Sequence, residues 1–191
     1  MPRPARYTVD VLLDAAADLL ASDGPGAVTM SAVARSTGAP SGSVYHRFPT
    51  RAALCGELWV RTEERLLDAL SEVLDGDSDS DGDPAHRGVA GALGVLGWCR
   101  AHPIEAHVLL TGPAQLGLED WPDHLVGRRK RLQRRLKKVL GEIPGDTARV
   151  SAAVIDVPYA IVRRHLGARQ AIPAAAEAIV EDCARALTAP N

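Results

Sequence analysis

Apolar residues recur every three or four positions along most of this chain, and Gly or Pro separates one such stretch from the next. This spacing predicts amphipathic helices. The first helix follows Thr8, whose hydroxyl can accept a hydrogen bond from the first turn, and it ends at Gly24-Pro25-Gly26. Because no alternating pattern of useful length indicates a strand, the sequence predicts an all-α protein with about nine helices.

Two short helices separated by a glycine come next. Thr29 is suited to cap the first of them, and Gly38 to close it, because glycine readily adopts the left-handed conformation found at helix ends. The second begins at Pro40, whose missing N–H costs nothing in a first turn, and stops at Pro49. A projection at about 100° per residue predicts an inner side made of Pro40, Val44 and Phe48, and an outer side made of Gly42, Ser43, Tyr45 and His46.

A helix, a glycine-containing turn and a second helix form the layout of a helix-turn-helix, whose second helix enters the DNA major groove. On the outer side of that helix, a glycine permits close approach to DNA, and hydroxyl and imidazole groups can bind base edges or phosphates. The N-termini of the neighbouring helices expose backbone N–H groups suited to phosphates. The sequence therefore predicts six DNA-binding residues, namely Thr29, Gly42, Ser43, Tyr45, His46 and Arg51.

A long helix and a second helical region follow. Thr50 is suited to cap a helix from Arg51 to about Leu74, which at 1.5 Å per residue spans about 35 Å. Residues 75–83, DGDSDSDGD, indicate an acidic linker. The predicted domains are a three-helix DNA-binding domain at 1–52 and a helical bundle at 53–191, joined by the long helix. In the bundle we expect helices near 84–101, 104–111, 122–142, 146–168 and 173–187.

One motif runs through the helix-turn-helix: Thr29-x-x-x-Val33-Ala34, then Gly38-Ala39-x-x-Gly42-Ser43-Val44-Tyr45-His46-x-Phe48-Pro49-Thr50-Arg51, ending in Ala53-Leu54. In this motif the chain resembles the TetR family of transcriptional regulators. The resemblance implies a homodimer with an N-terminal DNA-binding domain and a C-terminal domain, here 53–191, for ligand binding and dimerisation. It further implies a repressor of a palindromic operator that a small-molecule effector releases from double-stranded DNA.

The chain departs from the family at two positions, with Pro40 where Ser or Thr is common and Ser41 where Lys or Arg is common. Residues 1–55 carry five arginines and four aspartates, a net charge of +1 that is small for a DNA-binding domain. This favours a dimer, in which two binding surfaces add. It also leaves an alternative, a helical module that binds a small molecule or a protein and has lost specific DNA binding.

The resemblance places the effector inside the C-terminal bundle. Small-molecule sites combine apolar walls with a few polar groups, and seven residues of the bundle fit that description, although ordinary core packing explains each of them equally well. These ligand-binding candidates are Trp98, Cys99, His102, Leu109, Leu110, Trp121 and Tyr159. Trp59, on the long helix, is a further candidate for the domain-facing end of the pocket.

By the same resemblance, the last two long helices form the homodimer interface. Their apolar positions are Val150, Ala153, Val154, Val157 and Ile161 on one helix, and Ala175, Ala178, Ile179 and Ala186 on the other. Pro158 lies within the first of these helices, and we expect it to kink the helix because proline lacks the N–H that the backbone ladder needs.

Two charged segments suggest further sites. Asp77-Ser78-Asp79-Ser80-Asp81-Gly82 copies the opening of an EF-hand loop, but Gly88 stands where the bidentate carboxylate is required, which favours a solvated linker. Residues 128–138 form the most basic stretch, above an apolar stripe. This stretch predicts an amphipathic helix with a solvated cationic face. The alternatives are an anionic effector, or extra contacts to DNA or another acidic partner.

The sequence predicts no enzyme, metal site or cofactor. Cys99 and His102 lie three residues apart, with His107 and His124 further on, but no third group completes a metal or nucleophile site. The odd number and wide spacing of the cysteines disfavour disulfides. The chain has a net charge of −2, no long apolar run and no hydrophobic signal in MPRPARYTVD. We therefore expect a cytoplasmic protein with no membrane contact.

Overall fold

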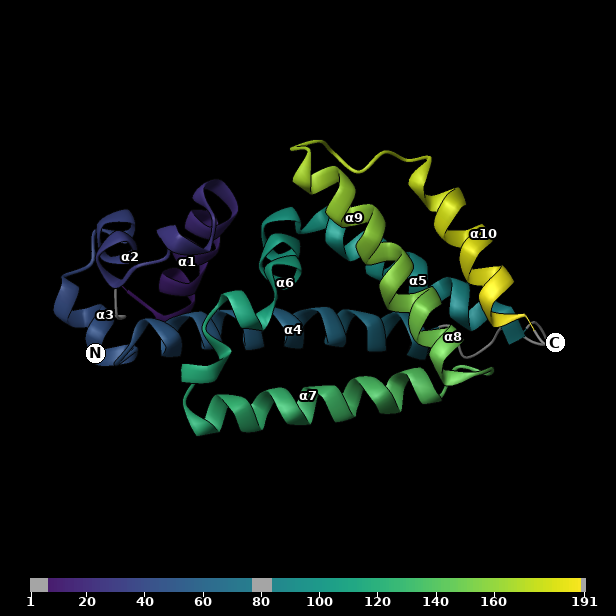
Figure 1. Ribbon diagram of the computed structural model, residues 1–191, viewed down its shortest axis with the longest axis horizontal. Helices are drawn as coiled ribbons and strands as arrows, with labels where there is room; N and C mark the ends of the chain where they lie inside the picture. The colour runs from purple at the N-terminus through teal and green to yellow at the C-terminus, as the bar shows by residue number, and fades with distance from the viewer. Residues whose placement is uncertain (1–6, 77–83, 190–191) are drawn as a thin grey trace. The chain divides into compact units, whose positions relative to one another are not determined.

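The computed structural model describes residues 7–76 and 84–189 (Figure 1). Those residues form helices and contain no strand, which confirms the predicted all-α class. The helices are α1 (Val9–Asp23), α2 (Met30–Thr37), α3 (Ser41–Arg47), α4 (Arg51–Gly76), α5 (Pro84–Ala101), α6 (Pro103–Gln115), α7 (Asp123–Gly141), α8 (Thr147–Ser151), α9 (Val157–Gly167) and α10 (Ala176–Thr188). A π-helical turn, Ala152–Asp156, joins α8 to α9 without a break, so nine helices are present in the described part of the chain when 147–167 counts as one.

Of the acidic linker predicted at 75–83, Asp75 and Gly76 belong to α4, which is a correction of the predicted bounds. The rest of it, with the EF-hand-like Asp77–Gly82, lies outside the described residues. None of the helices described here is long and apolar enough to cross a membrane.

The packing divides the chain into two compact units. The first combines the chain up to Thr62 with His107–Arg129, and the second combines Glu63–Ala106 with the chain from Lys130 onward. The predicted domains, 1–52 for DNA binding and 53–191 for ligand binding and dimerisation, are defined by function and not by packing. This division stays a prediction.

In the first unit, α1 packs on α2 and α2 on α3. Thr8 caps α1 as predicted, accepting a hydrogen bond from the Val11 N–H at 3.3 Å. The inward positions of α1, Leu12, Ala16 and Leu20, are at most 2% exposed. The sequence pattern therefore gives both the limits of α1 and its buried face.

In the second unit, α5 packs against α10, α9 and the π-helical turn. The buried face of α10 recurs every four residues, at Ala176, Val180, Ala184 and Thr188. Gly88 of α5 leaves the room that Thr188 fills, since a Cβ atom at Gly88 would lie 2.6 Å from the Thr188 methyl group. The α5–α10 pair thus depends on a glycine for its close approach.

Two helices are less regular than predicted. The helix expected at 104–111 extends to Gln115 but is interrupted at Gly112, whose φ of 78° and ψ of 156° are not helical, and Pro113 follows. At Pro158 the expected disturbance takes the form of the preceding π-helical turn, in which the Val157 N–H donates to the Ala152 carbonyl, five residues back. Proline needs no backbone partner there, and Pro158 is buried at the start of α9.

Candidate nucleic-acid interface

The turn between α2 and α3 has the geometry that the sequence predicts. Thr29 Oγ1 accepts a hydrogen bond from the Ala32 N–H at 3.1 Å and caps α2. Gly38 ends the helix in the left-handed conformation, with φ of 69° and ψ of 16°. The Tyr7 hydroxyl donates to the Gly38 carbonyl at 2.8 Å, which ties the residue before α1 to this turn. No local sequence signal indicates that last contact, because it joins residues 31 positions apart.

Two apolar side chains hold α3 in place. Val44 is fully buried and Phe48 is 4% exposed, as the projection predicts. Pro40 is a correction: it is exposed and precedes α3 as its N-cap residue, with ψ of 135°, while the neighbouring Ala39 is buried. The projection fails at this position because the helical repeat begins only at Ser41.

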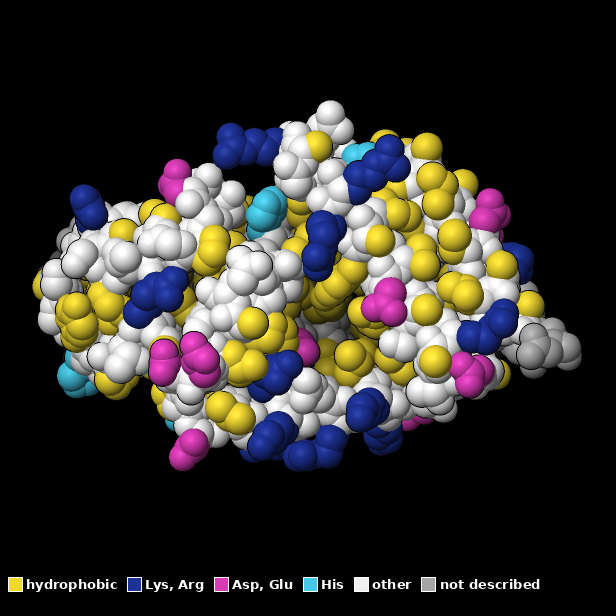
Figure 2. All heavy atoms as spheres, in the orientation of Figure 1, with side chains coloured by type: hydrophobic (Ala, Val, Ile, Leu, Met, Phe, Trp, Pro, Cys, Tyr) yellow, Lys and Arg dark blue, Asp and Glu magenta, His cyan; other side chains and the backbone are white. Residues whose placement is uncertain are grey.

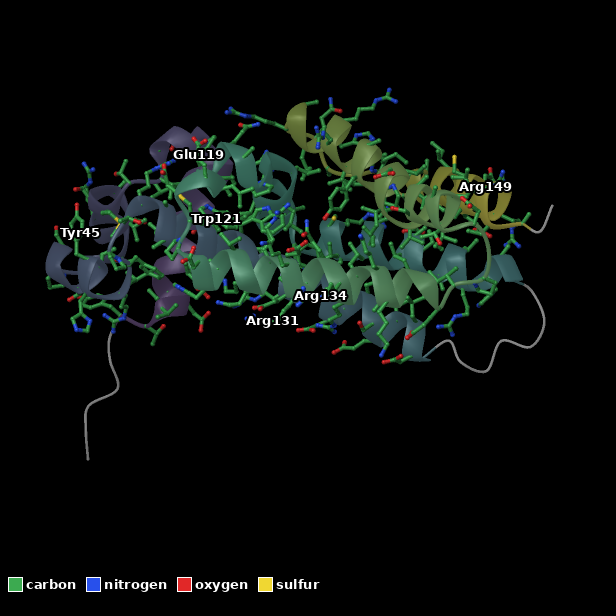
Figure 3. All side chains as sticks on the ribbon, turned by 60° about the horizontal axis from the view of Figure 1, so that its bottom comes forward. Tyr45, Glu119, Trp121, Arg131, Arg134 and Arg149 are labelled. Atoms are coloured by element: carbon green, nitrogen blue, oxygen red, sulfur yellow. The ribbon has the colours of Figure 1, made fainter. Side chains whose placement is uncertain are left out.

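The opposite side of α3 is open to solvent. Gly42 and His46 are exposed, Ser43 is half-buried and Tyr45 is 50% exposed. Figure 3 shows Tyr45 at the edge of the ribbon, with its side chain directed away from it. An open hollow of about 550 Å³ is lined by Gly42, Ser43, His46 and Arg47. Four of the six predicted DNA-binding residues therefore share one accessible surface on a single short helix.

Arg47 belongs to this surface, although the sequence did not single it out. It is half-buried, and its guanidinium donates to the Ser43 carbonyl one turn earlier, at 3.3 Å. Its position four residues after Ser43 was the available signal, since residues at that spacing lie on the same side of a helix.

Of the other two predicted contacts, Thr29 is exposed at the start of α2, whereas Arg51 is half-buried. The Arg51 Nε atom donates to the Val28 carbonyl at 2.7 Å, and Nη2 donates to the Pro25 carbonyl at 2.5 Å. The guanidinium therefore fastens the start of α4 to the chain before α2. A DNA contact by Arg51 stays a prediction.

The N-terminal half of α4 packs within the same unit through a pair of tryptophans. The Trp59 and Trp121 ring centroids lie 5.9 Å apart, and the Trp121 indole N–H donates to the Leu116 carbonyl at 3.0 Å. A Cβ atom at Gly56 would lie 2.9 Å from the Trp121 ring, so only glycine permits this approach. Trp121 is thus a packing residue of the first unit.

The predicted ligand-binding residues do not form one cluster within a unit. Leu109, Leu110 and Trp121 belong to the first unit, and the other four belong to the second. His102 lies just beyond the end of α5, exposed and with its ring stacked on Trp98 at a centroid distance of 4.9 Å, so it does not have the interior position expected of it. A ligand-binding role of these residues stays a prediction.

Within the second unit, Cys99 and Glu63 both lie close to Tyr159. Burial raises the pKa of the Cys99 thiol to about 12. Burial also raises the pKa of the Tyr159 hydroxyl, and the neighbouring Cys99 and Glu63 raise it further. Both groups therefore stay protonated and neutral near pH 7. The sequence missed Glu63 because its neighbours here come from α5 and α9.

Metal ligands do not converge in the described ranges 7–76 and 84–189, where no three His, Cys, Asp or Glu side chains are placed to hold an ion. The three cysteines, Cys55, Cys99 and Cys183, are free thiols.

Residues 12–58 match the model of a family described as bacterial regulatory proteins, tetR family. The matched segment contains α2, the Gly38 turn, α3 and the start of α4, and therefore includes the exposed side of α3 described above. Over this segment the chain is similar to the DNA-binding domain of the tetR family. A search of curated protein sequences finds no match.

Solved structures of transcriptional regulators share the fold over nearly the whole chain. A regulator from Rhodococcus sp. Rha1 is 20% identical and has a TM-score of 0.72, with 95% of this chain and 96% of that one covered. The fatty acid degradation regulator FadR from Bacillus halodurans is 16% identical with a TM-score of 0.72, over 98% and 96%. FadR from Bacillus subtilis, in complex with stearoyl-CoA, is 14% identical with a TM-score of 0.69, over 95% and 98%.

The matched domain supports a DNA-binding regulator of transcription with a helix-turn-helix domain. Proteins of the tetR family are not enzymes, and that confirms the expectation drawn from the sequence.

Proposed function

We propose that this protein is a homodimeric, sequence-specific repressor of the tetR family, released from a palindromic operator by a small-molecule ligand. The observation that carries the proposal is the division of α3 into two sides. Val44 and Phe48 fix the helix from below, while Gly42, Tyr45 and His46 remain exposed. Their hydrogen-bonding groups are therefore available to base edges and phosphates. As a regulator of transcription it would act in the cytoplasm, where the chromosome of a bacterium lies.

The exposed side of α10 supports dimerisation. Ile179 is 55% exposed, although isoleucine is usually buried. Ala178 and Ala186 on the same helix are also exposed, and so is Ala175, its N-cap residue. Small residues permit close approach of a second copy. The interface predicted from the sequence needs one revision: Val150, Ala153 and Val154 are fully buried within their own chain and have no area to offer a partner.

The proposal of a small-molecule effector rests on likeness to a solved structure. The FadR structure from Bacillus subtilis is in complex with stearoyl-CoA, and this likeness supports an effector with a long apolar part. In the second unit of this chain, Trp98, Cys99 and Tyr159 provide an apolar environment with one hydroxyl group. These three residues are the best-supported part of the predicted ligand-binding set.

Selection of bound duplexes from a random DNA library tests sequence-specific binding. The expected product is a palindrome whose half-sites are one helical turn, about 34 Å, or a multiple of that apart. The His46→Ala and Tyr45→Phe variants should each weaken binding to the selected duplex about tenfold or more, because a lost base or phosphate contact costs about 1–3 kcal/mol.

The matched control is His124→Ala, which removes an exposed imidazole from α7 rather than from α3. It should bind the selected duplex as the wild-type protein does, and all three variants should melt at an unchanged temperature. A library that yields no preferred sequence would refute sequence-specific binding. It would favour the alternative of a module that binds only small molecules or proteins.

A further inference from the structure

Cationic residues gather on α7. Residues 128–138 contain eight Lys and Arg and no acidic residue, in a chain whose net charge is −2. Figure 2 shows the result as a row of Lys and Arg atoms along the lower edge of the view, where Figure 1 places α7. Eight of the 22 Lys and Arg of this protein therefore lie close together on one helix.

Three of these eight residues are used within the chain. Arg128 pairs with Glu57 of α4 at 2.5 Å, and Arg135 pairs with Asp68 at 2.5 Å. The Arg129 guanidinium lies 5.5 Å from the centroid of the Trp59 ring, an arrangement typical of a cation–π contact. A fourth, Lys138, lines a small hollow together with the acidic Asp75 and Glu142.

The other four, Lys130, Arg131, Arg134 and Lys137, form what we call the basic face. All four are exposed, and no ion pair to them occurs among the residues that the structure describes. Lys130, Arg134 and Lys137 follow the i, i+4, i+7 spacing of a single helix side, and Arg131 lies beside them. In Figure 3 the labelled Arg131 and Arg134 both lie on α7, as neighbours one turn apart.

We propose that the basic face binds the phosphate backbone of double-stranded DNA without reading its sequence. From Lys130 to Lys137 the helix rises about 10 Å, a length over which one strand of B-DNA carries about three phosphates. Four exposed cations over this length match such a row of charges. Phosphate contacts of this kind supply most of the non-specific affinity of DNA-binding proteins.

The surroundings of the basic face favour DNA over other anionic partners. Leu125, Leu132 and Leu140 of α7 are buried, and its other apolar residues are half-buried. None of the large exposed apolar side chains among the described residues lies on this helix. A helix that binds a membrane surface needs an exposed apolar side. Protein interfaces are anchored by aromatic and large apolar residues. A phosphate backbone requires neither.

The small charge of the N-terminal region explains why the basic face would increase the attraction of the protein to DNA. Residues 1–55 have a net charge of only +1, so the region that contains α3 supplies little electrostatic attraction to DNA. The basic face would supply that attraction from another part of the chain. It would raise the affinity of the protein for any duplex and its rate of encounter with DNA.

The salt dependence of binding to random-sequence duplex DNA, measured by fluorescence anisotropy on the full chain, tests the proposal. The test variant is Arg131→Gln/Arg134→Gln. The matched control is Arg163→Gln/Arg164→Gln, which removes the same charge from two exposed arginines of α9 in the same unit. In the test variant the slope of log K against log salt should flatten by about 1.8, since each phosphate contact contributes about 0.9. The wild-type and control proteins should keep the steeper slope.

Between 50 and 200 mM salt, the wild-type protein should therefore lose about tenfold more affinity than the test variant. Equal slopes in the wild-type protein and the test variant overturn the proposal, and so does an equal flattening in both variants, which would reflect net charge alone. A test variant that loses binding to phosphatidylserine vesicles but not to duplex DNA overturns it in favour of a membrane surface. Because the duplex has no operator, failure of α3 to read sequence would not change these results.

Discussion

Arg61 of α4 places its guanidinium against Asp14 of α1, with an Nη2–Oδ1 distance of 2.8 Å. Its Nη1 atom lies 3.0 Å from Oδ1 of Asp10, one turn earlier on the same helix. The arginine side chain is only 10% exposed, whereas those of Asp10 and Asp14 are 69% and 61% exposed. One buried cation thus ties α4 to the helix on which the helix-turn-helix packs.

Because the arginine is buried and the aspartates are exposed, replacing Arg61 and replacing the two aspartates should lower the free energy of unfolding by different amounts. In Arg61→Met the exposed carboxylates return to water, so the free energy of unfolding should fall by only about 1–2 kcal/mol. In Asp10→Asn/Asp14→Asn the guanidinium stays buried without a counter-charge, and the loss should reach about 3 kcal/mol or more. Urea denaturation measures both values. A smaller loss in the aspartate variant would show that water reaches the guanidinium.

Gly56→Ala should destabilise the first unit. The new Cβ atom would lie 2.9 Å from both Trp121 and Leu125, and such overpacking costs about 1–3 kcal/mol. Gly97→Ala on α5 is the control, because nothing lies within 4 Å of its Cβ position and alanine favours a helix by up to about 1 kcal/mol. The two alanine variants should therefore change the melting temperature in opposite directions. Equal shifts would mean that Trp121 can move aside.

Arg51→Met should reduce stability as well as any affinity for DNA. The variant loses charge-assisted hydrogen bonds to the Val28 and Pro25 carbonyls, and we expect a loss of about 1.5–3 kcal/mol in the free energy of unfolding. Hydrogen exchange should become faster near Val28, where the chain is no longer held by α4. If DNA binding falls while the unfolding free energy stays the same, Arg51 acts at the DNA alone.

Stability should decline at alkaline pH because of Cys99. Its pKa is raised from 9.0 to about 12 in the folded protein, so the folded chain keeps a proton that the unfolded chain releases. The stabilisation is complete below pH 9 and is lost as the pH rises from 9 towards 12, with a slope of about 1.4 kcal/mol per pH unit. Tyr159, whose pKa is also raised, acts in the same direction above its ordinary value. Urea unfolding at increasing pH should show a shallower decline in Cys99→Ala.

The limits of the helices could be predicted because their causes are local. Thr8, Thr29 and Thr50 each cap the helix that follows, because the side-chain oxygen accepts a hydrogen bond from the backbone N–H three residues ahead. Gly38 closes α2 with its own backbone conformation. Such contacts involve residues within one turn of each other, so the amino-acid pattern contains them in full.

Contacts between distant segments could not be predicted in this way. The Arg51 guanidinium donates to carbonyls 23 and 26 residues away in the sequence. No local sequence pattern predicts contacts at such separations. His102 carried the chemistry of a binding residue, but the end of α5 leaves it exposed. Residue type therefore indicated candidates for the ligand site, whereas tertiary packing decided their positions.

The π-helical turn at Ala152–Asp156 has a consequence for any comparison of this chain with its relatives. Such a turn holds one residue more than an α-helical turn, and one residue corresponds to about 100° of rotation around the axis. Where a related regulator has a regular helix in this place, its alignment to this chain needs a one-residue gap within 152–156. Without the gap, each position up to Gly167 would be equated with a residue on the wrong side of the helix.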